Sequence, residues 1–186
     1  MLAQLRPAAA TLGLLTLVTG IAYPLAITGI GQVFLPAQAN GSLVVHDGGV
    51  VGSALVGQSF TSDRYFHGRP SATAPTPYNA GSSSGSNLGP SSKELLDLVH
   101  ERAVALGGNG PVPADLATAS GSGLDPDISP AGAAWQIDRV AAARGLTDVQ
   151  LQQLVAEHTR GRDLGILGQP RVNVLELNLA LDALKP

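Results

Sequence analysis

The sequence predicts a single N-terminal transmembrane helix followed by a small α/β extracytoplasmic domain. Three observations lead to this fold class. No charged residue occurs between Arg6 and Asp47, and residues 8–35 are almost entirely apolar. The rest of the chain combines Gly-rich turns with one β-like segment and several helical patterns. Apart from Arg6, no Lys or Arg precedes Arg64, so the positive-inside rule keeps the short N-terminus in the cytoplasm.

The apolar segment sets the expected domain boundaries. A spanning helix needs about 20 apolar residues, and a core helix seldom runs so long without a charge. Pro24 and the glycines of this segment would be costly in a soluble helix but are tolerated in membrane spans. The expected parts are a cytoplasmic N-terminus at 1–7, a transmembrane helix at 8–35 and an extracytoplasmic domain at 36–186.

Two alternatives concern this segment. A secretory signal peptide could be cleaved after the small residues at 37–39 (AQA), but the apolar core of such a peptide is about 7–15 residues long, much shorter than this one. An uncleaved anchor is therefore the expectation. Ala22 and Ala26, with Gly29 nearby, favour contact with another helix, and a uniformly lipid-facing helix is the alternative.

Composition excludes several classes of protein. The 186 residues correspond to about one domain, with 23 Gly and 13 Pro that indicate many loops. The chain has no Cys, which excludes disulfides, thiolate chemistry and Cys-ligated zinc. The net charge is −3 and no basic stripe is present, so no nucleic-acid partner is expected.

A β-hairpin is expected directly after the apolar segment. Valine and leucine residues lie on both sides of a turn at 47–49 (DGG), which is typical of two short strands. Residues 61–90 are rich in Pro, Gly, Ser and Asn, and indicate irregular backbone. A flexible linker is one interpretation, but Tyr65, Phe66 and Tyr78 indicate that part of this stretch packs on the domain.

Four helical patterns follow. Ser91 and Glu94 form a capping box ahead of 95–106, and Gly107-Gly108 ends the first helix. The second helix is expected to begin at Ser129-Pro130 and to end at Gly145. The third is expected to begin at the capping box of Thr147 and Gln150, and the fourth near Asn173. The last helix has an apolar face that contains Val174, Leu177, Leu181 and Leu184, widened by Leu175 and Leu179.

Residues 118–130 (TASGSGLDPDISP) form the most conspicuous loop. A weak nucleotide-binding candidate lies within it, made of Ser120, Gly121, Ser122, Gly123 and Asp125. A P-loop needs a Lys to reach the terminal phosphates, and this loop has none. The structural interpretation is that Asp125 and Asp127 initiate turns while Ser129 caps the next helix.

Other chemistry has little support. Asp125 and Asp127 begin a calcium-loop pattern, but Pro130 ends it, and the four His have no short metal-binding spacing. We therefore expect no catalytic residue, no metal site and no firmly bound cofactor. Five arginines occupy Gly- or Pro-rich settings, where they either pin loops internally or dock a partner: Arg64, Arg69, Arg160, Arg162 and Arg171.

The whole chain resembles the C subunit of the Kdp-type potassium-transporting ATPase of prokaryotes. The stretches that carry the resemblance are GSALVGQSF, YFHGRPSA, SGSNLGPSS, TASGSGLDPDISP, QIDRVAAARG and HTRGRDLGILGQPRVNVLELNLAL. They extend from the anchor to the C-terminus, and their combination is specific.

The resemblance implies a non-catalytic subunit in the cytoplasmic membrane. Its partners would be a channel-like potassium-translocating subunit, a P-type ATPase subunit, a small hydrophobic subunit and the lipid bilayer. ATP, magnesium and potassium would bind to the partner subunits. The family is described as stabilising assembly and as a catalytic chaperone that raises the affinity of the pump subunit for ATP.

Five residues within these stretches are candidates for partner contact: Tyr65, His67, Arg69, Asn87 and Arg171. One alternative function is a chaperone that binds nucleotide directly through residues 118–130. Direct contact with cytoplasmic ATP requires the opposite orientation, because a bilayer core of about 30 Å separates the two sides. Another alternative is an anchored enzyme that uses scattered Ser, His and Asp residues.

Overall fold

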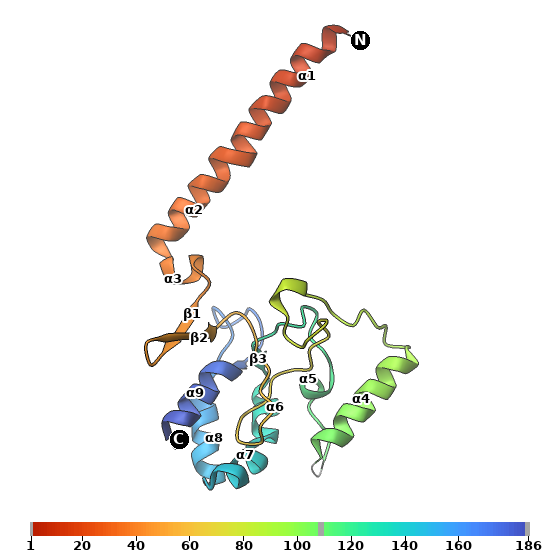
Figure 1. Ribbon diagram of the computed structural model, residues 1–186, viewed down its shortest axis with the longest axis vertical. Coiled ribbons are helices and arrows are strands. Elements are labelled where there is room, and N and C mark those ends of the chain that lie inside the picture. The colour runs from red at the N-terminus through yellow and green to blue at the C-terminus, as the bar shows by residue number, and fades with distance from the viewer. Residues whose placement is uncertain (1, 108–109, 185–186) are drawn as a thin grey trace. The chain divides into compact units, whose positions relative to one another are not determined.

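The computed structural model describes residues 2–107 and 110–184, and the chain divides into two compact units, Met1–Leu43 and Val44–Pro186. The first unit is helical (Figure 1). Its elements are α1 (Leu2–Leu15), the π-helical segment η1 (Thr16–Ala22), α2 (Tyr23–Phe34) and α3 (Pro36–Ala39). Within the described residues, Ala3–Phe34 is the one helix that is long and apolar enough to cross a membrane, and its side chains are uncovered by protein. This agrees with the expected N-terminal apolar helix.

The π-helical segment ends at Ala22, two residues before Pro24. The N–H group of Tyr23 donates to the carbonyl of Val18, five residues earlier, instead of the residue four earlier as in an α-helix. Proline lacks an N–H group, and its ring clashes with the carbonyl four residues before it. A widened turn at this point accommodates the ring, so the helix continues through Pro24 into α2.

The expected β-hairpin is confirmed, and all of it except Leu43 belongs to the second unit. Strands β1 (Leu43–His46) and β2 (Gly49–Ser53) form a two-stranded sheet. Asp47 and Gly48 connect them with φ angles of 49° and 78°. Two successive positive φ angles give the turn a twist that matches the strands, which is why Gly is favoured in it.

The remaining helices build the domain. They are the 3₁₀ turn η2 (Ala80–Ser82), α4 (Lys93–Leu106), α5 (Ala114–Ala117), α6 (Pro130–Trp135), α7 (Ile137–Arg144), α8 (Asp148–Glu157) and α9 (Val174–Leu184). Helices α6 to α9 lie together and enclose the core, α5 lies beside α6, and α4 packs on α5 farther from the core (Figure 1). The largest fully buried apolar side chains are Phe66, Leu151, Leu177, Leu181, Val140 and Val172.

Helix caps were predicted well where they depend on local sequence. The side chain of Thr147 accepts from the backbone of Gln150, whose side chain accepts from the Thr147 N–H, so the capping box is confirmed. Ser129 caps α6, as expected. The capping box of Ser91 was wrong, because a turn delays the helix by one residue and Ser92 accepts from the Leu95 N–H instead.

Two other details of the helices differ from the expectation, and a third agrees with it. Helix 130–144 is divided at Gln136, whose side chain reaches back to the carbonyl of Gly132. Leu184 is exposed at the end of α9, whereas Asn178 of the same helix is buried. Gly107 ends α4 with a φ of 63°, as expected, and Gly108 lies outside the described residues.

A second sheet joins segments that are distant in the sequence. Its strands β3 (Asp127–Ile128), β5 (Arg171–Asn173) and β4 (Thr159–Arg160) pair in that order, and both pairings are antiparallel. Asp127 pairs with Asn173 and Arg160 with Arg171. The domain is thus a small helix-and-sheet domain with antiparallel strands, and Asp127 lies in a strand rather than starting a turn.

Candidate functional site

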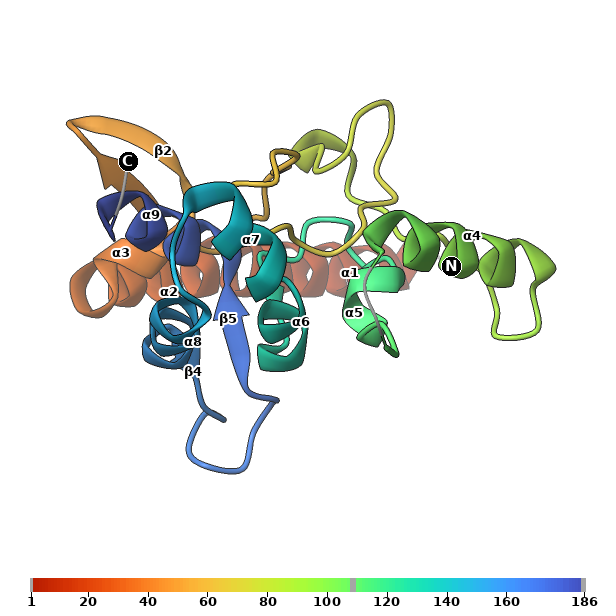
Figure 2. The same cartoon turned by 90° about the horizontal axis from the view of Figure 1, so that it is seen from below.

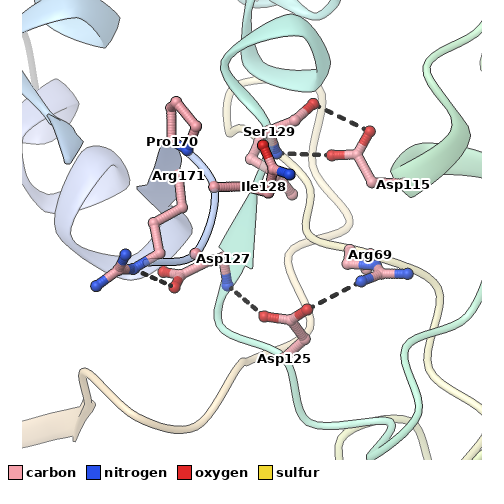
Figure 3. A pocket seen from close by; sticks show the side chains of 10 residues that line it. Arg69, Asp115, Asp125, Asp127, Ile128, Ser129, Pro170 and Arg171 are labelled. Atoms are coloured by element: carbon pink, nitrogen blue, oxygen red, sulfur yellow. Dashed lines mark hydrogen bonds and ion pairs between the residues drawn. The ribbon is translucent and has the colours of Figure 1, made fainter. Parts of the chain in front are cut away.

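A pocket of about 370 Å³ lies where β3 and β5 meet the irregular segment that contains Arg69 (Figure 3). Three chain segments distant in sequence converge there, which makes it the strongest candidate for a functional site. Its lining residues are Arg69, Asp115, Asp125, Asp127, Ile128, Ser129, Gly168, Gln169, Pro170 and Arg171. Three of the residues that the sequence singled out, Arg69, Asp125 and Arg171, therefore share one site.

Arg69 and Asp125 form the first pair of the site. The Nη1 atom of Arg69 lies 3.0 Å from Oδ2 of Asp125, and both side chains are partly exposed. The Nη2 atom of Arg69 donates to the carbonyls of Thr118 and Ala119 at 3.5 and 3.4 Å. Oδ1 of Asp125 accepts from the N–H of Asp127 at 3.1 Å. Arg69 therefore holds both ends of the loop that precedes β3.

Arg171 and Asp127 form the second pair. The Nε atom of Arg171 lies 3.5 Å from Oδ2 of Asp127, and its Nη2 atom lies 3.3 Å from Oδ2 of Asp163. Burial raises the pKa of the Asp127 carboxyl, and the negative charge of Asp125 raises it further. The hydrogen bond from Asn173 and the charge of Arg171 oppose this shift. This half-buried carboxylate is thus less favourable in its charged form than an exposed one.

The third carboxylate, Asp115, is occupied by the start of α6. Its Oδ2 atom accepts from the N–H of Ser129 at 2.7 Å, and its Oδ1 atom accepts from the hydroxyl of the same residue at 3.1 Å. Gly132 lies so close that an added Cβ would come within 2.8 Å of the carboxylate. Asp115 therefore locks α5 to α6, and it lies in a short helix where no sequence pattern pointed to it.

The electrostatics of the pocket do not favour an anionic ligand. Its lining holds three carboxylates and two guanidinium groups, which sums to a formal charge of −1. A phosphate 4 Å from an unpaired carboxylate would be repelled by about 1 kcal/mol even in bulk water. The arginines already bind carboxylates of this chain, so the arrangement supports internal pinning of loops by Arg69 and Arg171.

The weak nucleotide-binding candidate is divided by the structure. Asp125 lines the pocket, whereas Ser120, Gly121, Ser122 and Gly123 do not. Polar groups of Ser120, Ser122 and Gly123 form hydrogen bonds within the chain, either with the segment 71–85 or within the loop. The bonds are Ser84 N to Ser122 O, Ser83 Oγ to Ser122 O, Ser71 Oγ to Gly123 O and Gly123 N to Ser120 O. The loop is thus built into the domain.

The other candidates for partner contact lie outside the pocket. The hydroxyl of Tyr65 donates to Asp182 at 3.1 Å, and the Arg144 guanidinium lies 4.8 Å from the Tyr65 ring centroid. Burial lowers the pKa of His67, whose Nε2 atom lies 3.0 Å from the carbonyl of Ser62. Asn87 is exposed and has a φ of 53°.

Two buried amides near these residues were missed at the sequence level. Gln136 binds the backbone of His67, and Asn178 binds the backbone of Phe66, each through its oxygen and its nitrogen. For Asn178 a weak sequence signal was available, because this polar residue interrupts an otherwise apolar helical face and a buried amide needs hydrogen-bond partners. Within residues 2–107 and 110–184, no group of three or more His, Asp and Glu side chains is placed to hold a metal ion.

Comparison with known proteins gives consistent similarities over almost the whole chain. The family model described as "KdpC: K+-transporting ATPase, c chain" matches residues 5–183. Three similar proteins are each named "Potassium-transporting ATPase KdpC subunit". The protein of Rhodopseudomonas palustris (strain BisB18) is 55% identical over 199 residues, covering 100% of both chains. That of Burkholderia vietnamiensis is 59% identical over 184 residues, covering 96% of this chain and 95% of its own. That of Methylobacterium nodulans is 56% identical over 198 residues, covering 99% and 98%.

Proposed function

Because this chain belongs to the KdpC family of K+-transporting ATPase c chains, we propose that it stabilises the assembly of a membrane-embedded potassium pump. Family membership makes it an accessory, non-catalytic subunit of the pump. The finer role is to hold a channel-like potassium-translocating subunit and a P-type ATPase subunit together, with a small hydrophobic subunit as a further partner. Potassium, magnesium and ATP would bind to those partners.

The observation that carries this proposal is the first unit of the chain. Ala3–Phe34 forms a helix of 32 residues whose apolar side chains are uncovered, including Val33 and Phe34 near its end. Such a surface needs lipid or other apolar helices around it. In the folded domain, in contrast, four arginines are paired with acids of the domain itself: Arg69, Arg144, Arg160 and Arg171. This combination fits a subunit that acts by binding in the membrane better than one that carries out chemistry.

The proposed orientation places the domain outside. Removing Arg6 from the 11 Lys and Arg residues leaves 10 positive charges against 14 acidic ones, so the part after the helix has a formal charge of about −4. Positive residues are favoured on the cytoplasmic side, and acidic ones contribute little to this rule. Arg6 therefore favours an N-terminus inside and a domain on the outer face of the cytoplasmic membrane.

A chaperone effect on ATP affinity would then act at a distance. Coupling between two sites needs a shared element with two states, and the membrane helices could provide one. Direct contact through residues 118–130 would need the domain inside, and the polar groups of that loop are largely used within the domain. Saturable binding of ATP by the purified chain alone would favour the direct alternative.

The function can be tested with three versions of the chain in cells that lack their own copy. One is the full chain, one is residues 40–186 exported by a cleavable signal, and one has residues 8–35 replaced by a Leu/Ala span of equal length. The full chain is expected to support potassium uptake and co-purification of the ATPase subunit. The exported domain is expected to support neither. The Leu/Ala version keeps the membrane anchor but removes the specific side chains of residues 8–35, so it separates the effect of anchoring from that of specific helix contacts. Normal uptake with the exported domain alone would overturn the proposal.

A further inference from the structure

The connection between β4 and β5, residues 161–170, exposes a compact group of large apolar side chains. Leu164, Ile166 and Leu167 are 88%, 75% and 56% exposed. Figure 2 shows this connection standing clear of the helices at the lower edge of the domain. We call these three residues the apolar tip. Single exposed leucines are common on protein surfaces, but three within four residues form a patch that calls for a partner.

The backbone of the apolar tip is fixed before any partner arrives. Asp163 and Leu167 exchange two backbone hydrogen bonds of 2.9 Å, and the N–H of Gly165 donates to the carbonyl of Arg162 at 3.1 Å. The base is held by Arg171, which binds the carboxylate of Asp163. A rigid presentation lowers the entropy lost on binding, which is a property of interface anchors.

Leu164 is poorly suited to its place if folding alone is considered. Its φ angle is 54°, in the left-handed region that Gly, Asn and Asp adopt far more readily than Leu. It also contributes little to the core, because most of its side chain faces solvent. Neither backbone preference nor burial accounts for a leucine at this position, so its apolar side chain points to a use outside the domain.

The charges around the apolar tip indicate what kind of partner it fits. Arg160 binds Glu176 at 2.6 Å, and Arg171 binds Asp163 and Asp127. Among the described residues, Arg162 has no carboxylate within ion-pair distance, and its hydrogen-bond contact is Oε1 of Gln169 at 3.5 Å. Anionic lipid surfaces are recognised by clusters of about four to eight cations, whereas protein interfaces combine apolar anchors with a polar rim. One available guanidinium beside three apolar side chains fits a protein.

We propose that the apolar tip docks into an apolar pocket, with a hydrogen-bond acceptor for Arg162 at its rim, on another protein subunit of the same membrane complex. The inference rests on the proposed assembly function and deepens it by naming the surface that makes the contact outside the membrane helix. Leu164 and Ile166 are the anchors, and the glycines at 165 and 168 keep the turn that presents them.

The first experiment uses the full chain, tagged and purified from membranes that contain the other pump subunits. Leu164→Asn removes an anchor while placing a residue that accepts the positive φ, so the fold is not expected to suffer. The double variant Leu164→Asn/Ile166→Asn is expected to reduce the co-purified ATPase subunit about ten-fold or more, as hot-spot anchors do. The matched control is Leu96→Asn on α4, at a leucine that is 62% exposed, which is expected to change the yield less than about two-fold. Unchanged co-purification of the double variant would overturn the inference.

The second experiment identifies what lies against the apolar tip. A photo-crosslinking amino acid at position 166 is expected to link the chain to one pump subunit, identified by mass. A link only to lipid, only to a second copy of the chain, or to nothing would overturn the inference. Deleting the whole chain separates the two proposals. A pump that stays assembled without the chain overturns both, whereas a pump that falls apart without it but still binds the tip variant overturns only this one.

Discussion

Two buried amide side chains take the place of a neighbouring strand in this domain. The Oδ1 atom of Asn178 accepts from the N–H of Phe66 and its Nδ2 atom donates to the carbonyl of Phe66, both at 2.9 Å. Gln136 does the same for His67 at 2.7 and 3.0 Å. Because buried backbone groups must be paired, these amides allow an irregular segment to lie against the core.

Replacing Asn178 tests this arrangement. Asn178→Leu keeps the number and branching of the side-chain heavy atoms but leaves two buried backbone groups without a partner, each at a cost of about 1–3 kcal/mol. We expect the free energy of unfolding to fall by roughly 2–5 kcal/mol, measured by urea unfolding of the full chain in mild detergent. Gln153→Leu is the control, because Gln153 is exposed and its side chain bonds to that of Glu157 rather than to buried backbone. Equal stability of the two variants would show that the amide pairing is unimportant.

His67 makes stability depend on pH in a defined direction. Burial lowers its pKa below the ordinary value of 6.5, the hydrogen bond with Ser62 and the charge of Asp63 oppose this, and the charge of Arg139 adds to it. A lowered pKa in the folded state means that the unfolded chain binds the proton first, so stability is lost as pH falls below about 6.5.

We therefore expect His67→Gln to show a flatter stability curve than the unchanged chain between about pH 7 and pH 5. Thermal unfolding across that range provides the measurement, with His100→Gln as a control at an exposed histidine. A steeper loss of stability in His67→Gln would contradict a lowered pKa of His67 in the folded state.

The residues that were predicted from sequence are those whose partners are close by in the chain. Thr147 meets its partner three residues later, and Ser129 caps a helix that starts at the next residue. Asn178 and Gln136 meet backbone partners 112 and 69 residues away. Nothing in the local pattern specifies such a pairing, so their roles could be read only from the structure.

At the scale of elements, the hairpin and the long helices were predictable and the second sheet was not. Strands β3, β4 and β5 have two or three residues each, which is too short for an alternating pattern to be visible. Their pairing brings Arg171 beside Asp127, and with it the pocket. The sequence singled out Arg69, Asp125 and Arg171 but could not show that they meet, because their meeting depends on this sheet.

The N-terminal helix offers a test at the same scale. Pro24→Ala restores the missing N–H group, and we expect η1 to convert to a regular α-helix. An α-helix advances about 100° per residue, so losing the widened turns would rotate the apolar face of α1 relative to that of α2 by roughly 100°. A helix that packs on partner helices along its whole length would lose part of that contact.

The expected result for Pro24→Ala is normal membrane insertion with a several-fold lower yield of co-purified ATPase subunit. Pro7→Ala is the control, since Pro7 lies within α1 and outside the π-helical segment. If the two variants co-purify the ATPase subunit equally well, the π-helical segment has no part in contacts between helices.

At the scale of the whole molecule, the proposed function depends on which side of the membrane carries the domain. The chain consists of an uncovered apolar helix and a folded domain of formal charge about −4. Arg6, near the N-terminal end of the helix, is the one charged side chain in the helix. The segment that links helix and domain contains no Lys or Arg until Arg64. Orientation therefore rests on very few charges, which makes it open to reversal by substitution.

Protease added to intact spheroplasts is expected to digest the domain and leave the helix protected. The double substitution Arg6→Gln/Ala39→Lys moves the single positive charge to the other end of the helix, so a large fraction of the chains should become inverted and protease-resistant. Lysed spheroplasts provide the control, because every domain is then accessible. Protection of the unchanged domain in intact spheroplasts, with digestion after lysis, would place it inside. In that case the separation from cytoplasmic ATP by about 30 Å of bilayer core would no longer hold, and direct nucleotide binding would have to be tested first.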